Sequence, residues 1–307
     1  MSAGLLARPF DLRLPLGRGL LARVTGGTGR AERLALVETL RPLAARVLGG
    51  GALGYGLFQD DGAGLERHVV TVLSDRATGR AVAFNVLPVL TLDWPEGSED
   101  VLHLGLVMVD PAARGRGLTT ALYGLAGVVM FLRGGARPLL VSSVTQVPAV
   151  FGMVATTYGG VFPGARPRPT FRQTLVARRI MAHHRAAFGV GPEARFDERR
   201  FVVEDGYRGG SEALKKSWAD APRHRDERHN DWMRGALDYE RGDDVLQLGE
   251  IDLGAAQTVL RRHLPRGSVP GLLALGALEG VRALVLPALH WFDTSRPLGE
   301  LAARGGR

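Results

Sequence analysis

A glycine- and arginine-bearing loop between an apolar strand and an apolar helix holds the residues best placed to do chemistry. Residues 101–109 are rich in Val and Leu, and Arg114, Gly115, Arg116 and Gly117 follow just before the helix. Glycines let backbone N–H groups approach a ligand closely, and the first helical turn offers unpaired donors at the positive end of its dipole. The stretch therefore predicts a phosphate site; an ordinary strand-to-helix turn is the alternative.

Two common phosphate motifs do not fit this loop. The Gly-Lys-Ser/Thr of the Walker motif is missing, and Thr120 stands where the dinucleotide fingerprint G-x-G-x-x-G needs its last glycine. The loop instead resembles the acyl-CoA loop of the GNAT superfamily of N-acetyltransferases, whose pattern is Arg/Gln-x-x-Gly-x-Gly/Ala after a strand ending in Val-x-Pro. Arg114, Gly117 and Thr119 occupy its three key positions. Thr119 departs from the usual Gly or Ala, although its small hydroxyl fits and could donate to a phosphate.

The resemblance covers roughly residues 65–175, with a looser match to a helix over 31–48. Strands at 68–73 and 81–92 precede the loop, and a strand at 138–144 and a helix at 148–158 follow it, in the family's order. Departures occur at Val147, where Asn is often found, and at Phe151, where Tyr is common. The resemblance implies direct transfer of an acyl group from acetyl-CoA, or another acyl-CoA, to an amine.

The family places the CoA in a slot where the loop strand and the next strand splay apart. By this resemblance, backbone groups of Met108 and Val109 would bind the pantetheine amides. The pyrophosphate would be held by successive loop residues, namely Arg114, Gly115, Arg116, Gly117, Leu118 and Thr119.

The proton-transfer residues are poorly marked. The loop strand has no Glu, so His103 is the candidate base, because its ordinary pKa of about 6.5 suits the task. Tyr158 is the candidate acid. A packing role is the alternative for each, and a water chain could replace both, since proximity supplies much of the rate.

Composition narrows the function classes. The 307 residues carry a net charge of +8, but all basic residues except Lys215 and Lys216 are arginines spread along the chain, so a nucleic-acid partner is unlikely. The absence of cysteine excludes a disulfide scaffold, a thiolate metal site and a cysteine nucleophile. The pairs 183–184 and 224/229 do not have the spacing of histidine metal ligands, so no metal is expected.

The expected fold class is α/β, a GNAT-like mixed and mostly antiparallel twisted sheet flanked by helices. Residues 1–176 form the acyltransferase domain, and residues 177–307 form a mainly helical C-terminal extension or second domain. In the extension, helices are expected at 182–188, 211–219 and 253–264 and a strand at 199–204. The acidic residues 238–244 could receive a cationic amine, but a turn is the preferred interpretation.

The segment 269–292 is apolar and long enough to span a membrane, yet Glu279 and Arg282 lie near its middle. A buried helix or helical pair is expected, with peripheral membrane contact as the alternative. No clean secretion signal is found at the start of the chain, so a cytoplasmic location is expected.

Three functions remain. The first is acetyl transfer to a primary amine of a small molecule or peptide. The second uses a longer acyl chain, delivered by CoA or by an acidic acyl carrier protein that the positive charge would attract. The third is a GNAT-like module that binds CoA without catalysis.

Overall fold

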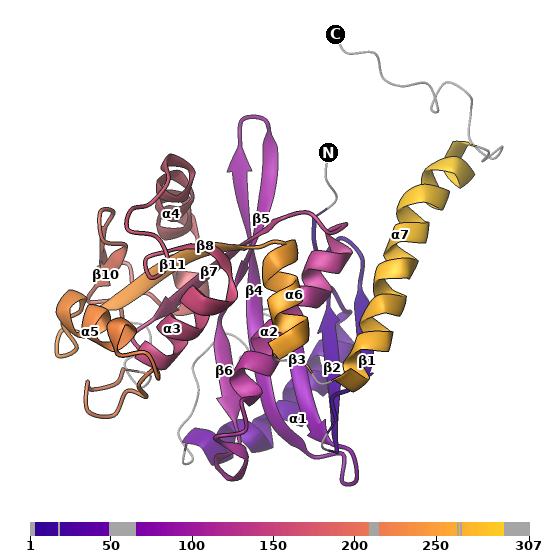
Figure 1. The fold of residues 1–307 in the computed structure, drawn as a ribbon, viewed down its shortest axis with the longest axis horizontal. Helices are drawn as coiled ribbons and strands as arrows, with labels where there is room; N and C mark the ends of the chain where they lie inside the picture. Colours follow the sequence, from indigo (N-terminus) through magenta and orange to yellow (C-terminus); the bar gives the residue numbers. More distant parts are fainter. Residues whose placement is uncertain are drawn as a thin grey trace.

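The computed structural model describes residues 4–17, 19–48, 66–208, 215–262, 264 and 266–291. Its centre is an 11-stranded sheet in the order β1-β2-β3-β4-β5-β7-β11-β10-β9, with β6 paired to β4 and β8 paired to β11 (Figure 1). The strands are β1 Phe10–Pro15, β2 Leu20–Gly26, β3 His68–Asp75, β4 Ala81–Trp94, β5 Gly97–His103, β6 Leu106–Val109, β7 Leu139–Thr145, β8 Gly159–Phe162, β9 Arg195–Asp197, β10 Val202–Glu204 and β11 Asp244–Ile251.

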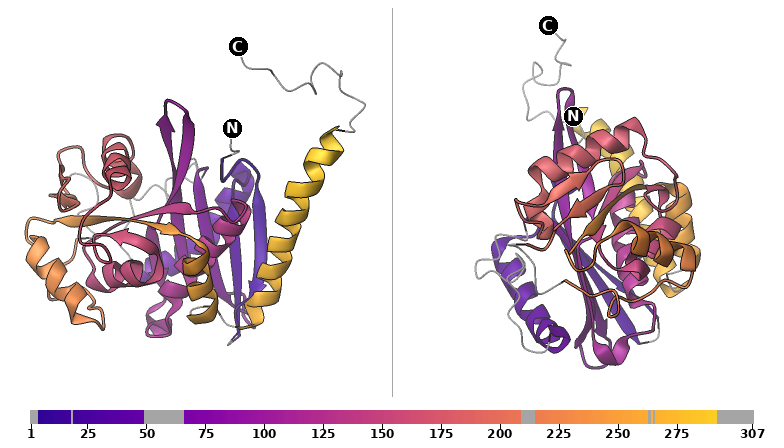
Figure 2. Two further views of the ribbon diagram at one scale, coloured as in Figure 1. Left: turned by 45° about the horizontal axis from the view of Figure 1, so that its top comes forward. Right: turned by 90° about the vertical axis from the view of Figure 1, so that its left-hand side faces the viewer.

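The α-helices cover both faces of this sheet. They are α1 Arg30–Leu48, α2 Leu118–Arg133, α3 Pro148–Thr157, α4 Phe171–His183, α5 Glu227–Ala236, α6 Leu253–Arg262 and α7 Val269–Trp291. Short 3₁₀ turns are η3 Pro111–Ala113, η4 Arg185–Phe188 and η6 Arg266–Ser268. The right-hand view of Figure 2 shows α1 on one side of the strands and α7 on the other.

The pairing of the strands confirms the expected fold class. All pairs are antiparallel except β5 with β7, which is parallel over Val101–His103. A mixed, mostly antiparallel sheet flanked by helices, with helices in the C-terminal region, is therefore what the chain forms.

Alternation along β4 shows which helices share a face. Successive side chains of a strand point to opposite faces. Phe84 and Val86 pack in the cluster under α1, and Leu90 and Leu92 pack in the cluster under α4. Leu87, between them in the sequence, packs in the large cluster beneath α2. The helices α1 and α4 therefore lie over one face, and α2 lies over the other.

The helix expected at 31–48 forms as α1 and runs through Pro42 without ending there. The helix α4 begins with a capping box between Thr170 and Gln173. The helix expected at 182–188 is the end of α4 followed by η4. Only the last part of the strand expected at 199–204 is a strand, β10.

The sheet continues across the boundary expected at residue 176. The strand β11 pairs with the full length of β7, from Val245 opposite Thr145 to Ile251 opposite Leu139. The strands β8 and β11 pair with each other, although the elements α4, η4, β9, β10 and α5 separate them in the sequence. The last strand of the central sheet thus comes from the second expected region and borders the first.

Other parts of the C-terminal region depart from the expected elements. The charged run at 222–231 contains the start of α5. Within the range expected as a helix at 211–219, residues 215–219 are not helical and residues 211–214 lie outside the described residues.

The apolar segment from 269 forms one helix, α7, up to Trp291; residue 292 lies outside the described residues. The helix packs along α2, where Glu279 pairs with Arg133 at 3.5 Å. It exposes Leu273, Leu278 and Val281 on its outer side. Within the described part of the chain, no helix combines the length and apolarity needed to cross a membrane.

Candidate active site

The strand that leads into the loop is broken in the middle. β4 pairs first with β6, up to Val86 opposite Leu106, and then with β5, from Val89 opposite Leu102. Residues 104 and 105 form the break. On the other side, β5 pairs with β7 only as far as His103, and one further hydrogen bond joins Leu104 N to Ser142 O at 2.7 Å. Beyond that bond, β6 has no pairing with β7 among the described residues, so the two strands separate.

Residue types at the break explain why it occurs. Pro88, opposite the break on β4, has no N–H to continue the ladder. A Cβ on Gly105 would lie 2.6 Å from Val86 O and 2.9 Å from Pro88 Cδ, so only glycine fits. The Tyr123 hydroxyl of α2 donates to Gly105 O at 2.7 Å and holds the broken strand from the face of the sheet that α2 covers. The opening in the sheet is thus built into the sequence at three positions.

A cavity of about 210 Å³ lies where the strands separate. Its lining residues are His103, Leu104, Gly105, Leu106, Val107, Tyr123, Ser143, Val144, Thr145, Val147, Val150, Phe188, Val190, Tyr207 and Asp244. Val144 packs in the cluster under α4, so its neighbours in the chain, Ser143 and Thr145, face the α2 side. Because residues of both faces line the cavity, it extends through the sheet.

One edge of β6 is open toward this gap. Asp110 N donates to Val82 O at 2.9 Å, so Asp110 directs its backbone groups at β4. The direction alternates along an antiparallel strand, so Met108 also faces β4, whereas Val107 and Val109 turn their N–H and C=O groups away from it. Val107 and Val109 therefore carry the backbone N–H and C=O groups that could bind the pantetheine amides. The backbone groups of Met108 face β4 instead, and its side chain is buried under α1.

The loop after β6 leaves a run of amides without acceptors. Arg114 N donates weakly to Pro111 O at 3.4 Å, and the next backbone bond is from Ala121 N to Gly117 O at 3.2 Å. From Gly115 to Thr120, no amide has an acceptor among the described residues. Gly117 caps α2 with φ of +72°, and a Cβ there would meet nothing within 4 Å. The predicted phosphate-binding amides thus lie together at the start of α2.

Two features hold this loop in place. Asp110 caps η3 by accepting from Ala112 N at 3.0 Å, and Arg46 of α1 donates to its other oxygen at 3.2 Å. These contacts lower the pKa of Asp110, with the Ala112 amide as the largest cause. The side chains of Arg114 and Arg116 are exposed, and neither forms an ion pair within the described chain.

His103 lies in the cavity but is a weak proton acceptor. It is 1% exposed, its Nδ1 is 3.0 Å from Ser142 Oγ, and its ring stacks on Phe188 at 4.6 Å. Burial, and secondarily the nearby His68, lowers the pKa of His103 to about 3. A neutral imidazole of such low basicity holds a proton poorly at neutral pH.

Tyr158 does not line the cavity. It ends α3 and packs on the α2 side, near Gly127. Burial raises its pKa, and its hydroxyl has no hydrogen-bond partner among the described residues. The structure therefore places the two predicted catalytic residues apart, with only His103 at the opening.

Tyr207 is a cavity residue that sequence reasoning missed, and Asp244 was considered only as the last residue of the acidic segment 238–244, for which a turn was preferred. Asp244 begins β11, is 4% exposed, and accepts from the Tyr207 hydroxyl at 3.1 Å. Burial, together with the neighbouring Asp243, raises the pKa of Asp244 to about 7, although the Tyr207 hydrogen bond opposes this shift. The alternating apolar residues after Asp244 are typical of a strand. This signal in the sequence could have assigned Asp244 to the strand rather than to the preceding turn.

Ser143 adds an unpaired polar group to the same cavity. Its side chain is fully buried, and its Oγ has no hydrogen-bond partner among the described residues. Buried hydroxyls are normally paired with protein or an ordered molecule. A polar ligand atom in the cavity would satisfy this hydroxyl.

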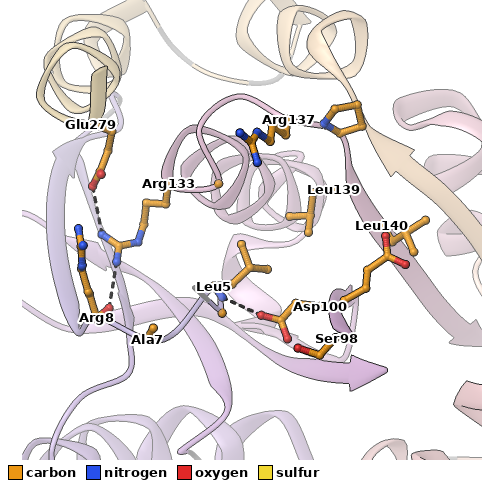
Figure 3. Close-up of a pocket in the computed structure, with 14 residues that line it drawn as sticks. Leu5, Ala7, Arg8, Ser98, Asp100, Arg133, Arg137, Leu139, Leu140 and Glu279 are labelled. Atoms are coloured by element: carbon orange, nitrogen blue, oxygen red, sulfur yellow. Dashed lines mark hydrogen bonds and ion pairs between the residues drawn. The ribbon is translucent and has the colours of Figure 1, made fainter. Parts of the chain in front are cut away.

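A larger cavity, of about 430 Å³, lies at the opposite end of α2, where the N-terminal segment, β5 and α7 meet (Figure 3). Several of its charged groups have protein partners. Asp100 Oδ2 accepts from Leu5 N at 2.7 Å, and Arg133 pairs with Glu279 and donates to Arg8 O. These contacts join the two ends of the described chain to the sheet, which is a structural role.

A third cavity, of about 590 Å³, lies between α3 and α5. Phe151 stacks on Trp232 there at 4.8 Å, with His229 at its edge. His224 and His229 contact each other by their rings, and no group of three metal-ligating side chains occurs in the described residues.

Sequence comparisons identify no relative. No protein-family model matches the chain, and no curated protein matches it.

Comparison with solved structures finds acyltransferases at low similarity. An acetyltransferase of Trypanosoma brucei is 22% identical, with 38% of this chain and 77% of that chain covered and a TM-score of 0.28. Nourseothricin acetyltransferase is 23% identical, with 28% and 44% covered and a TM-score of 0.19. A cAMP-binding acyltransferase of Mycobacterium smegmatis is 18% identical, with 46% and 41% covered and a TM-score of 0.22. Because these scores and identities are low, we base the functional assignment on the geometry of this chain.

Proposed function

We propose that this protein is a CoA-dependent N-acyltransferase of the GNAT type that transfers an acetyl group from acetyl-CoA to a primary amine. The observation that carries the proposal is the opening between β6 and β7, with a cavity where the strands part and unpaired amides at the start of α2. A splayed strand pair followed by such a loop is what the sequence resemblance implies for CoA.

Each part of acyl-CoA has a matching surface. The pyrophosphate fits the amides of Gly115–Thr120, where the helix dipole favours negative charge. The pantetheine amides fit the open backbone edge at Val107 and Val109, which would extend the sheet as a further strand does. The thioester would then lie near Gly105, in the cavity that extends to the opposite face.

The size of the cavity favours a short acyl group. Its volume of about 210 Å³ is below the ~300–1,000 Å³ of pockets that hold drug-sized ligands. Among the residues that the structure describes, none from α7 lines this cavity, so they do not form the tunnel that a long acyl chain would need. An acyl carrier protein as donor and a peptide as acceptor are the alternatives, and rate measurements with each of them in place of acetyl-CoA or the small amine test them.

Binding of CoA compounds tests the donor site. Acetyl-CoA, a long-chain acyl-CoA and free CoA are titrated by calorimetry into the wild type and Gly117→Glu. The new carboxylate would stand among the phosphate-binding amides, so we expect affinity to fall at least about 100-fold.

A matched control lies at the other end of the same helix. Gly135 has φ of +75° and, like Gly117, nothing within 4 Å of an added Cβ. Gly135→Glu therefore carries the same backbone strain, and we expect its affinity to stay within about twofold of the wild type. Absence of binding to all three compounds, or equal losses in both variants, would refute the proposed donor site. Binding without turnover of any amine would identify a non-catalytic module instead.

A further inference from the structure

The wall of the cavity that faces α4 has a distinctive charge pattern. Among the described lining residues there is one carboxylate, Asp244, and there is no lysine or arginine. The remaining wall on this side is apolar or aromatic, with Val144, Phe188 and Val190. A cation that entered here would lose its hydration but gain one negatively charged partner. An anion would lose its hydration without gaining a positively charged partner.

We propose that Asp244, positioned by the Tyr207 hydroxyl, binds the ammonium group of the acceptor and takes up its proton; this inference rests on the function proposed above. The acceptor is therefore an amine that arrives protonated and enters from the face covered by α1 and α4. The donor occupies the opposite side of the opening, along β6 and the start of α2.

The contacts around Asp244 fix the carboxylate and leave one oxygen available. Oδ1 accepts from Tyr207, while Oδ2 lies beside Gly206, where a Cβ would come within 3.1 Å of it. The Gly206 amide is itself held by Gly242 O at 2.9 Å. The backbone at Asp244 pairs with Val203 of β10, and the next residue, Val245, pairs with Thr145 at the end of β7. Oδ2 is thus the oxygen that can receive a proton.

Several ionisable groups surround this carboxylate. His103 from β5 lines the same cavity and is neutral, and Tyr207 and Tyr239 are phenols whose pKa values burial raises. Asp243, the preceding residue, is neutralised by Arg241 through two bonds of 2.7 Å. Burial is therefore the main reason why the pKa of Asp244 stands at about 7, close to the value that suits a general base at neutral pH.

The proton and electron balance is complete without another reagent. The ammonium gives one proton to Asp244 Oδ2, and the freed nitrogen lone pair forms the bond to the thioester carbonyl carbon. As the C–S bond breaks, its electron pair leaves with sulfur, and a second proton from the same nitrogen converts the thiolate to CoA thiol. The products are the amide, CoA and a proton on Asp244 that water then removes.

Steady-state kinetics with acetyl-CoA and a panel of primary amines test the assignment, with released CoA thiol as the readout. Asp244→Asn keeps the shape and the Tyr207 contact but cannot take the proton. We expect kcat/KM for the amine to fall by about 10²–10³-fold, while calorimetric affinity for acetyl-CoA stays within about twofold. Asp100→Asn, which changes a largely buried side-chain carboxylate in the middle of β5 that lies outside the cavity, serves as the control and should keep wild-type kinetics.

The pH profile separates a proton-transfer role from a structural one. Wild-type kcat/KM for the amine should rise through an apparent pKa near 7, and Asp244→Asn should lack this limb. Tyr207→Phe removes a hydrogen bond that lowers the pKa of Asp244, so its limb should move to higher pH, with kcat reduced by about 3–10-fold.

The outcomes distinguish this inference from the proposed function. Wild-type turnover with Asp244→Asn within about threefold, and an unchanged acid limb, would overturn the role of Asp244 and leave the acyltransferase standing. Failure of the wild type to bind acetyl-CoA, or to acylate any amine in the panel, would overturn both.

Discussion

The two walls of the central cavity are built in different ways. The wall proposed to bind the acyl donor, here the donor wall, comes from one continuous stretch, residues 104–120, and offers mainly backbone groups. The wall proposed to bind the amine, here the acceptor wall, combines side chains from β5, η4, the loop after β10 and the start of β11, so Asp244 and His103 come from distant parts of the chain. Backbone recognition depends on strand and helix geometry, whereas side-chain recognition depends on single functional groups. Variants of the two walls should therefore fail in different ways.

The largest effect is expected where backbone geometry creates the donor wall. Gly105→Ala places a Cβ 2.6 Å from Val86 O, which we expect to destabilise the fold by about 3 kcal/mol and to abolish acetyl-CoA binding. Gly280→Ala, where an added Cβ meets nothing within 4 Å, is the control and should be neutral or stabilising. Urea unfolding measures both, and equal stabilities would show that the break tolerates a side chain.

The acceptor wall should make stability depend on pH. The folded state holds the His103 proton less tightly than the unfolded chain, because burial lowers its pKa from 6.5 to about 3. Its contribution is complete above pH 6.5 and is lost as pH falls, at about 1.4 kcal/mol per unit. Between pH 7.5 and pH 5, the wild type should lose about 2 kcal/mol more than His103→Gln. Parallel pH curves for the two proteins in urea unfolding would contradict this.

Asp244 should make the free energy of unfolding depend on pH in the direction opposite to that of His103. Its pKa is raised from 3.8 to about 7 in the folded state, so its favourable contribution is complete below pH 3.8 and is lost as pH rises toward 7. Relative to the wild type, Asp244→Asn should therefore gain stability between pH 4 and pH 7. A stability difference between the two proteins that does not change with pH would show that this carboxylate is not buried in the folded state.

Removing the Tyr123 hydroxyl, which bonds Gly105 O at the break, should reduce stability less than the substitution of Gly105. Tyr123→Phe leaves Gly105 O without its 2.7 Å bond, and we expect a loss of about 1–2 kcal/mol in unfolding free energy. The KM for acetyl-CoA should rise while kcat changes little, since the donor wall alone is loosened. A fall in kcat at constant KM would place Tyr123 on the acceptor side.

The smallest effect is expected from exposed side chains of the donor wall. Arg114→Gln and Arg116→Gln remove charges but leave the amides of the loop in place. Acetyl-CoA affinity should fall by about 2–5-fold at low salt, and the difference should shrink at high salt because exposed charges are screened. Calorimetry at two salt concentrations measures this, and a salt-independent loss of 100-fold would mean that the side chains, rather than the amides, bind the phosphates.

Prediction from sequence worked best where the determining contacts are local. The loop from Asp110 to Gly117, the helix that follows it and the strands around it show their types through spacing, glycines and apolar periodicity. The break at Gly105 was not predicted, because residues 101–109 were expected to form one strand, and only strand pairing brings Pro88 beside Gly105. The family resemblance implied Met108 and Val109 for the pantetheine contact, and only the register with β4 shows that Val107 and Val109 carry the open backbone groups.

The residues of the acceptor wall could not be predicted from local sequence signals. The residues 238–244 favoured a turn, which is correct for Asp238 to Asp243, where side-chain oxygens bind nearby amides. Asp244 reaches the cavity because β11 pairs with β7, and that pairing joins residues about a hundred positions apart.

By itself, the sequence indicated the glycine-bearing loop before an apolar helix, because this loop depends on backbone conformation and nearest neighbours, and the family resemblance indicated the mostly antiparallel sheet. The tertiary structure alone decided that His103 is buried and weakly basic, that Tyr158 lies away from the opening and that Asp244 lies within it. Burial and long-range strand pairing set these properties, and both depend on which distant segments come together when the chain folds.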